Sequence, residues 1–151
     1  MARPFLCYNP LMTNNRAFMA SIERFEQQTA AKMRKIALAS MLDLFNDAQN
    51  PVAKGGSMPV DTSNLRNSFV IEINGSQVGE GGDSYVLGIN GFQIGDIVQG
   101  AWGAPYAMRI NYGFSGEDSL GRTYNYTGTM FRDKAAAKWQ NIVSKNARAA
   151  R

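Results

Sequence analysis

The feature that most constrains this chain is a long segment near its N-terminus with the apolar period of a helix. From about Asn14 to about Gln49, apolar side chains recur at intervals of three or four residues or their multiples, with charged residues between them. The apolar members of this pattern are Phe18, Ile22, Phe25, Met33, Ile36, Leu44 and Phe45. A helix of about 35 residues is ~50 Å long, which exceeds the width of a small domain. We therefore expect part of it to extend beyond the core, where it either bends around its own domain or reaches a neighbour.

The ends of this helix carry boundary signals. Thr13, Asn14 or Asn15 can serve as the N-cap, and Pro51 disfavours helical geometry in the residue before it. Residues 1–13 are therefore expected to form an extended arm. Prolines interrupt this arm, and it lacks the continuous apolar core of a secretory signal, so we expect a protein made in the cytoplasm.

Length and composition indicate one domain. The chain has 151 residues, of which 44% are hydrophobic, and a chain of this size buries enough surface to fold alone. No stretch approaches the ~20 consecutive apolar residues that cross a bilayer. We therefore treat residues 1–151 as a single domain with no membrane segment.

The chain contains no histidine, which removes most catalytic and metal-binding schemes from consideration. Zinc sites built on histidine and Ser-His-Asp triads are excluded, and the single cysteine, Cys7, has no histidine to activate it. The central acidic residues are scattered, and the Gly-rich run beside them matches no phosphate-binding or dinucleotide-binding motif. We expect no cofactor, no metal and no enzymatic activity. A carboxylate-dependent hydrolase would require two acidic residues, such as Asp83 and Asp96, to face each other in a pocket.

The middle of the chain reads as a short helix followed by strands. Asp61, Thr62 and Ser63 are N-cap candidates for a helix near 62–68. Alternating apolar residues predict a strand over 69–73 that ends at an Asn-Gly turn. Residues 84–89 and 92–98 flank a second Asn-Gly pair at 90–91, which predicts a hairpin, and Gly95 suggests a bulge in its second strand.

The last third predicts a second short helix, a long loop and a closing helix. Pro105 and Gly113 suit the start and the end of a helix near 104–112. Residues 114–128 are polar and Gly-rich and are predicted to form a long loop. A helix begins near Met130, and residues 144–151 form a basic tail that extends past its apolar stripe. The predicted fold is therefore α+β, with the N-terminal and C-terminal helices packed on a small, mostly antiparallel sheet.

Positive charge is concentrated at the C-terminus. Six basic residues and one acidic residue give residues 132–151 a net charge of +5, whereas the other 131 residues sum to −1. Lys138, Lys145, Arg148 and Arg151 are candidates for contact with DNA or with an acidic partner. The same charges also fit a helix whose C-terminus is stabilised by cations.

The order of these parts resembles the tail-completion or head-tail joining proteins of long-tailed bacteriophages. The resemblance covers nearly the whole chain. It rests on the long first helix and on three motifs, whose residues are Pro59, Asp61, Thr62, Asn64, Leu65, Arg66 and Ser68, then Ala104, Pro105, Tyr106, Ala107, Tyr112 and Gly113, then Phe131.

The resemblance implies a structural virion protein at the neck or top of the tail. Such a protein assembles as a ring, which is usually six-fold, and genomic DNA passes through the ring without sequence-specific contact. Its other partners are the head connector or stopper protein and the tail tube or tail terminator protein. The expected interface residues are Asp61, Thr62, Asn64, Arg66, Trp102, Tyr106, Tyr112, Tyr124, Tyr126 and Phe131.

Several of these residues have a second interpretation. Arg66 faces either an adjacent subunit or a carboxylate of its own chain, and Trp102 and Tyr106 serve either the core or a subunit contact. The alternative function is a small nucleic-acid-binding protein that uses the basic C-terminal helix, with Tyr124 and Tyr126 as stacking platforms for bases. That function requires affinity for DNA that falls steeply with salt.

Overall fold

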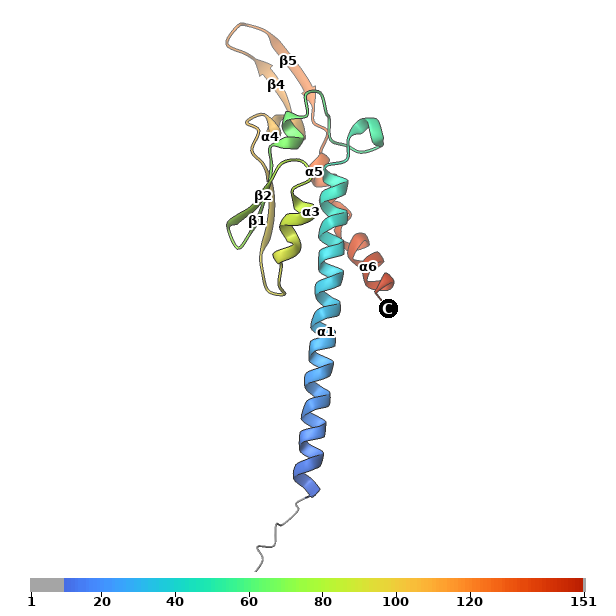
Figure 1. Ribbon diagram of the computed structural model, residues 1–151. Helices are drawn as coiled ribbons and strands as arrows, with labels where there is room; N and C mark the ends of the chain where they lie inside the picture. The colour runs from blue at the N-terminus through green and yellow to red at the C-terminus, as the bar shows by residue number, and fades with distance from the viewer. Residues whose placement is uncertain (1–9, 151) are drawn as a thin grey trace, which may run out of the picture.

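The computed structural model describes residues 10–150 and has an α+β fold, as predicted. A 39-residue helix, α1 (Pro10–Ala48), is about 58 Å long and is the axis of an elongated molecule (Figure 1). Its C-terminal half lies in the globular part, and its N-terminal half projects from it. The prediction that part of α1 extends beyond the core is confirmed.

The start of α1 differs from the prediction. The helix begins at Pro10, so Thr13, Asn14 and Asn15 lie inside it and do not cap it. Proline suits a first helical turn, because its missing N–H group has no partner there in any case. The predicted extended arm is therefore wrong for residues 10–13, and residues 1–9 lie outside the described part of the chain.

A three-stranded antiparallel sheet packs beside α1. The central strand, β1 (Phe69–Ile73), pairs with β2 (Ser76–Glu80) and with β3 (Val98–Trp102). Asn74 and Gly75 join β1 to β2 with φ values of 53° and 78°, which suits a tight hairpin turn. The prediction of β1 and of the turn after it is confirmed.

The predicted hairpin at residues 84–98 is wrong. Residues 84–91 form a short helix, α3 (Tyr85–Gly88), and a 3-10 turn, η2 (Ile89–Gly91). Tyr85 and Ile89 are 2% and 1% exposed and lie four residues apart, so a helical turn directs both into the core. The only bulge in the sheet among the described residues lies between Ile71 and Glu72, whereas Gly95 is in a turn.

The core consists of two clusters of buried residues. The larger joins α1 to β1 and α3, and its members are Met41, Phe45, Phe69, Ile71, Tyr85, Ile89 and Phe92. The smaller contains Met58, Leu65 and Phe131. Trp102 links the two, because its ring centroid lies 5.1 Å from that of Phe69 and 5.0 Å from that of Phe131.

Three short elements connect these parts. They are η1 (Val52–Lys54), α2 (Asn64–Asn67) and α4 (Ala107–Tyr112). The two short helices predicted near 62–68 and 104–112 are thus present, although α4 begins two residues after Pro105. Gly113 follows α4 with φ of 91°, a value that L side chains rarely adopt.

The predicted loop at 114–128 is instead a second hairpin. Strands β4 (Gly113–Glu117) and β5 (Thr123–Thr127) pair in antiparallel register. Asp118 organises the turn, because its carboxylate accepts hydrogen bonds from the backbone N–H groups of Leu120 and Arg122, both at 2.9 Å. A polar, Gly-rich segment can therefore form strands when one side chain closes the turn.

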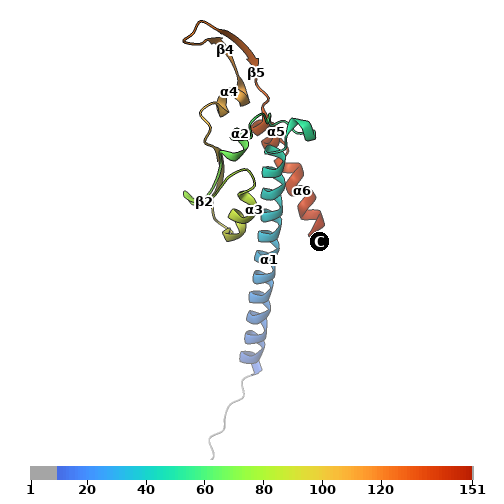
Figure 2. The same cartoon turned by 45° about the horizontal axis from the view of Figure 1, so that its top comes forward.

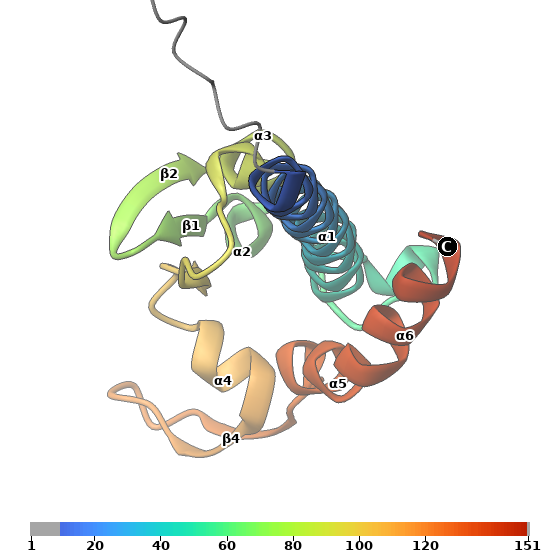
Figure 3. The same ribbon diagram turned by 90° about the horizontal axis from the view of Figure 1, so that it is seen from below.

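The C-terminal region consists of two helices, α5 (Phe131–Ala137) and α6 (Trp139–Ala149). The view from below shows α1 between the β1–β3 sheet with α3 on one side and α5 with α6 on the other (Figure 3). The C-terminal helices therefore pack mainly on α1. The predicted basic tail is helical as far as Ala149, because Lys145 and Asn146 are held against α1; Arg151 lies outside the described residues.

Candidate assembly surfaces

The projecting half of α1 exposes large apolar side chains. Phe18 is 62% exposed, Phe25 70% and Met33 53%, and Ile22 between them is 43% exposed. Their spacing places them on one face of the helix. An apolar stripe of this size in water is typical of a surface that another protein covers.

A second exposed surface lies at the opposite end of the molecule, where the β4–β5 hairpin projects (Figures 1 and 2). A hollow of about 640 Å³ at the base of the hairpin is lined by Tyr106, Arg109, Ile110, Phe114, Glu117, Asp118, Ser119, Tyr124 and Tyr126. The three tyrosines are 39–40% exposed, so each presents part of its ring to solvent. Exposed tyrosines around a concave surface are typical of protein interfaces.

The side chains of this hollow support one another. The Arg109 guanidinium lies 4.5 Å above the Phe114 ring, and the Tyr124 hydroxyl donates a hydrogen bond of 3.0 Å to Asp118. Hydrogen bonds also lower the pKa of Asp118, first of all the one from the backbone of Arg122, so the carboxylate stays charged at neutral pH. Sequence reasoning identified Tyr106, Tyr124 and Tyr126 but missed Arg109, Phe114 and Asp118. The Asp118–Gly121 segment, with an aspartate and a glycine suited to a turn, was the sequence signal that could have predicted this hairpin.

The two longer motifs that carry the phage resemblance meet beside this hollow. A neighbouring depression of about 370 Å³ is lined by Pro59, Asp61, Thr62, Ser63, Asn64 and Leu65 together with Tyr106 and Ile110. Asp61 and Thr62 are exposed, but neither caps α2. Ser63 occupies the N-cap position with φ of 63°, and no side-chain hydrogen bond caps the helix. Leu65, 5% exposed, holds the motif against the smaller core cluster.

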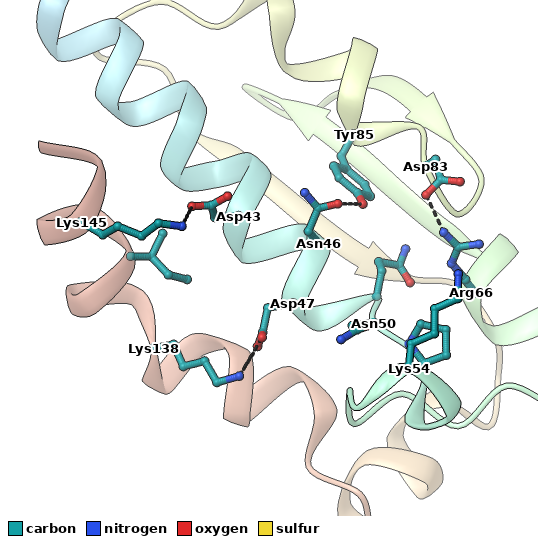
Figure 4. Close-up of a pocket in the computed structure, with 13 residues that line it drawn as sticks. Asp43, Asn46, Asp47, Asn50, Lys54, Arg66, Asp83, Tyr85, Lys138 and Lys145 are labelled. Carbon is teal, nitrogen blue, oxygen red and sulfur yellow. Dashed lines mark hydrogen bonds and ion pairs between the residues drawn. The ribbon is translucent and has the colours of Figure 1, made fainter. Parts of the chain in front are cut away.

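Arg66 belongs to a polar cleft between α1, α6, α2 and α3 (Figure 4). Its guanidinium forms an ion pair with Asp83 at 2.5 Å. This contact supports the local-carboxylate interpretation of Arg66 over the subunit-contact interpretation. The cleft has a volume of about 510 Å³ and also contains Lys138 and Lys145.

The two lysines of this cleft are held by acidic residues of α1. Lys138 Nζ lies 2.7 Å from an oxygen of Asp47, and Lys145 Nζ lies 3.3 Å from Asp43 (Figure 4). Their charges are therefore shared with carboxylates of the same chain. Arg148 is exposed near the end of α6.

Asp83 and Asp96, the carboxylates named in the hydrolase hypothesis, lie in different surroundings. Asp83 is paired with Arg66, whereas Asp96 lines a different hollow and accepts hydrogen bonds from Asn74 and from the backbone of Gln93. Burial raises the pKa of Tyr85, and its hydroxyl donates to Asn46 at 2.6 Å, so the phenol remains protonated. Asp83 and Asp96 therefore do not face each other as the hydrolase hypothesis requires.

Phe131 and Trp102 contribute to the core. Phe131 is 2% exposed, and the Trp102 indole donates a hydrogen bond to the buried Gln49 side chain at 3.3 Å. Phe131, which was expected at an interface, is therefore buried in the core, and the contacts of Trp102 agree with the core interpretation of that residue. Tyr112 is 49% exposed and carries the Arg132 guanidinium 5.3 Å from its ring centroid, so it remains on the surface.

Sequence reasoning gave no role to Asn111, which is 4% exposed. Its amide donates to Asp133 at 2.6 Å and accepts from the backbone N–H of Arg132 at 3.1 Å, which joins α4 to the first turn of α5. The hydrogen bond from the Asn111 amide to the Asp133 carboxylate is the main cause of the lowered pKa of Asp133. The base of the hairpin is thereby fixed to the C-terminal helices.

Comparisons with known proteins give no relative. No family model, curated protein or solved structure matches the chain. Within residues 10–150, no helix combines the length and the apolar character needed to cross a membrane, and no group of three or more acidic or cysteine side chains could hold a metal ion.

Proposed function

We propose that this chain is a structural virion protein that forms a ring at the head-tail junction of a long-tailed bacteriophage. The observation that carries the proposal is the presence of two exposed surfaces at opposite ends of an elongated subunit (Figure 1). One is the apolar stripe of α1, and the other is the tyrosine-lined hollow beside the hairpin. A joining protein needs this arrangement, because each subunit contacts its ring neighbours and also the layers on either side of the ring.

The core between these surfaces supports the same function. Two linked clusters hold the C-terminal half of α1, the sheet and the C-terminal helices together, so both exposed surfaces extend from one folded core. The hairpin is stabilised by its own ladder and by the Asn111–Asp133 contact. Preformed surfaces reduce the entropy lost on docking, which favours assembly from dilute subunits.

The motifs of the phage resemblance are consistent with a partner surface at the hairpin end. Asp61, Thr62 and Tyr106 lie around one depression next to the hollow that contains Tyr124 and Tyr126. In the proposed assembly this end contacts the head connector or stopper protein, or the tail tube or terminator protein. Genomic DNA passes through the lumen of the ring.

The nucleic-acid-binding alternative has less support. Lys138 and Lys145, two of its four proposed contacts, already pair with Asp47 and Asp43. Phosphate binding would have to break or share these pairs, which lowers the number of counterions that DNA binding can release.

The proposal is tested in the parent phage by an early stop codon in this gene. We expect electron micrographs of the lysates to contain full heads and finished tails that are not joined, and a plasmid copy of the wild-type gene to restore joined particles. Joined particles at normal yield without the plasmid would remove the neck function. A salt titration of DNA binding by the purified chain would then test the alternative.

The same complementation assay tests the hairpin surface. A plasmid copy with Tyr126→Ala should restore joining less well than a copy with Leu120→Ala. Leu120 is 74% exposed at the tip of the same hairpin and does not line the hollow. Equal restoration by both copies would exclude the hollow as a partner surface.

A further inference from the structure

One face of α1 is already covered by a helix along part of its length. Helix α6 runs antiparallel to α1, with Lys138 beside Asp47 at one end and Asn146 3.4 Å from the buried Ser40 further along. The last turn of α6 lies against Ile36, where Ala149 and Ala150 line a small hollow. Beyond this point α1 continues without α6 (Figure 1).

The uncovered part of the same face carries the apolar stripe. Taking 100° per residue, the stripe is in line with Ile36 and Ser40, which α6 covers. Its positions repeat after eleven residues: Phe18, Ile22 and Phe25 are followed by Thr29 and Met33, and Ile36 continues the repeat where α6 covers the face. An eleven-residue repeat keeps a stripe nearly parallel to the helix axis, so partner helices pack almost straight, with a slight right-handed twist.

The two flanks of the stripe carry opposite charges around residues 23–26. Arg24, Lys32 and Lys35 lie on one flank. Glu23 and Glu26 lie on the other flank, with Arg16 before them and Arg34 after them, and the Arg34 guanidinium donates hydrogen bonds to the backbone carbonyls of Asn90 and Phe92. Both acidic residues are within one helical turn of Arg24 along the axis. Over residues 23–26 the stripe therefore has one basic flank and one acidic flank.

This asymmetry distinguishes two ways of pairing with a second copy. In a parallel pair, the flank on one side of the stripe meets the opposite flank of the neighbour, so acidic residues face basic residues. In an antiparallel pair, each flank meets its own equivalent, so like charges face each other. Attraction between opposite charges favours the parallel arrangement, and repulsion between like charges disfavours the antiparallel arrangement.

We propose that residues 18–33 of α1 form an assembly helix that packs in parallel with the same helix of a second copy of this chain. The inference deepens the ring function proposed above and rests on it for the number of copies that meet. When more than two copies pack in parallel around one axis, the basic flank of each copy contacts the acidic flank of the next. Such contacts close into a ring when the rotation between neighbours allows it.

The test uses site-specific cross-linking of the full chain. In a Cys7→Ser background, which removes the single cysteine, Ile22→Cys and Met33→Cys each place one thiol on the stripe. A short bis-maleimide should link both variants into dimers and higher species as protein concentration rises. The two positions are about 16 Å apart along the axis. An antiparallel pair can bring at most one of them close to its own equivalent.

A matched pair of variants tests the stripe itself. Phe25→Asp should reduce the cross-linked yield severalfold, and Ala31→Asp, an equal charge on the opposite and exposed face, should leave it unchanged. Reversing the acidic flank with Glu23→Lys and Glu26→Lys should also reduce the yield. Reversing the basic flank as well, with Arg24→Glu and Lys32→Glu, should restore it.

Three outcomes would overturn the inference. They are no cross-linked product at either position at the highest concentration, product at only one position, and product that is equally abundant in the Phe25→Asp background. The ring function fails separately, in the stop-codon experiment. If the stop codon abolishes joining and a plasmid copy with Phe25→Asp restores it fully, the ring function is kept. This helix is then excluded as the contact between copies in the ring.

Discussion

Replacing Phe131 by alanine should lower the free energy of unfolding of the isolated chain by about 3–5 kcal/mol. The side chain is 2% exposed and packs with Met58 and Leu65 in the smaller core cluster. Its ring meets that of Trp102 edge-on, with centroids 5.0 Å apart and an interplanar angle of 85°. Truncation therefore removes buried apolar surface, leaves a cavity and breaks the aromatic contact that joins the two clusters.

This loss is large on the scale of the whole protein. Domains are stable by about 5–15 kcal/mol, so Phe131→Ala removes a substantial fraction of the total. For a chain of about 150 residues, each kcal/mol corresponds to roughly 2–4 °C in the midpoint of thermal unfolding. We expect the midpoint to fall by roughly 6–20 °C.

Urea unfolding followed by tryptophan fluorescence measures the effect, because Trp102 lies in contact with the substituted ring. The control is Tyr126→Ala, whose side chain is 40% exposed and should change stability by no more than about 0.5 kcal/mol. Equal unfolding midpoints for the two variants would refute the reasoning. Phe131 would then belong to a surface that is buried only on assembly.

Three other substitutions test the core and the hydrogen bonds around it. Gln49→Met should cost about 1–3 kcal/mol in urea unfolding, because the Trp102 N–H and a buried backbone carbonyl lose their partner; wild-type stability would show that water replaces both bonds. Gly100→Ala should cost about 1–3 kcal/mol in the same assay, because the new Cβ would lie 2.7 Å from two core phenylalanine rings; a more stable variant would contradict that packing. The Asn111 hydrogen bond lowers the pKa of Asp133 from 3.8, so this carboxylate stabilises the fold above that value and loses its effect as the pH falls through the lower folded-state pKa. The unfolding midpoint of Asp133→Asn should therefore fall less than that of the wild type between about pH 5 and about pH 3, and equal falls would contradict this contribution.

Local sequence patterns predicted the elements whose period and boundaries agree with one another. The spacing from Phe18 to Phe45 indicated α1, and its length alone required a projecting part. The alternation from Phe69 to Ile73 before Asn74-Gly75 indicated β1 and its turn. In these segments intrinsic propensity, apolar period and turn chemistry favour the same structure, so little is left for distant contacts to decide.

Local sequence patterns gave the wrong secondary structure in segments whose residues are compatible with two different structures. Residues 84–91 contain β-branched and aromatic residues before an Asn-Gly pair, which fits a strand, yet Tyr85 and Ile89 reach the core together only on a helical turn. Residues 114–128 look like a loop by composition, but the Asp118 side chain closes a hairpin there. In both cases packing or a single side chain outweighed propensity.

The exposed surfaces were predicted in part. Tyr106, Tyr124 and Tyr126 were expected on an interface and are exposed around one hollow, whereas Phe131, expected with them, is buried. An aromatic residue in a sequence carries no sign of whether its ring is covered. Burial depends on neighbours such as Met58 and Leu65, which lie more than sixty residues away along the chain.

The sequence by itself determined the α+β class, the long helix with its projecting stripe, the central strand and the absence of histidine chemistry. Only the tertiary structure decided which charges and rings remain available to partners. Lys138 and Lys145 meet Asp47 and Asp43 across 91 and 102 residues of chain, and those pairs involve two of the six basic residues that the sequence places between 132 and 151. The physical reason is that helical period and turn chemistry act between near neighbours, whereas ion pairing and burial depend on residues that only folding brings together.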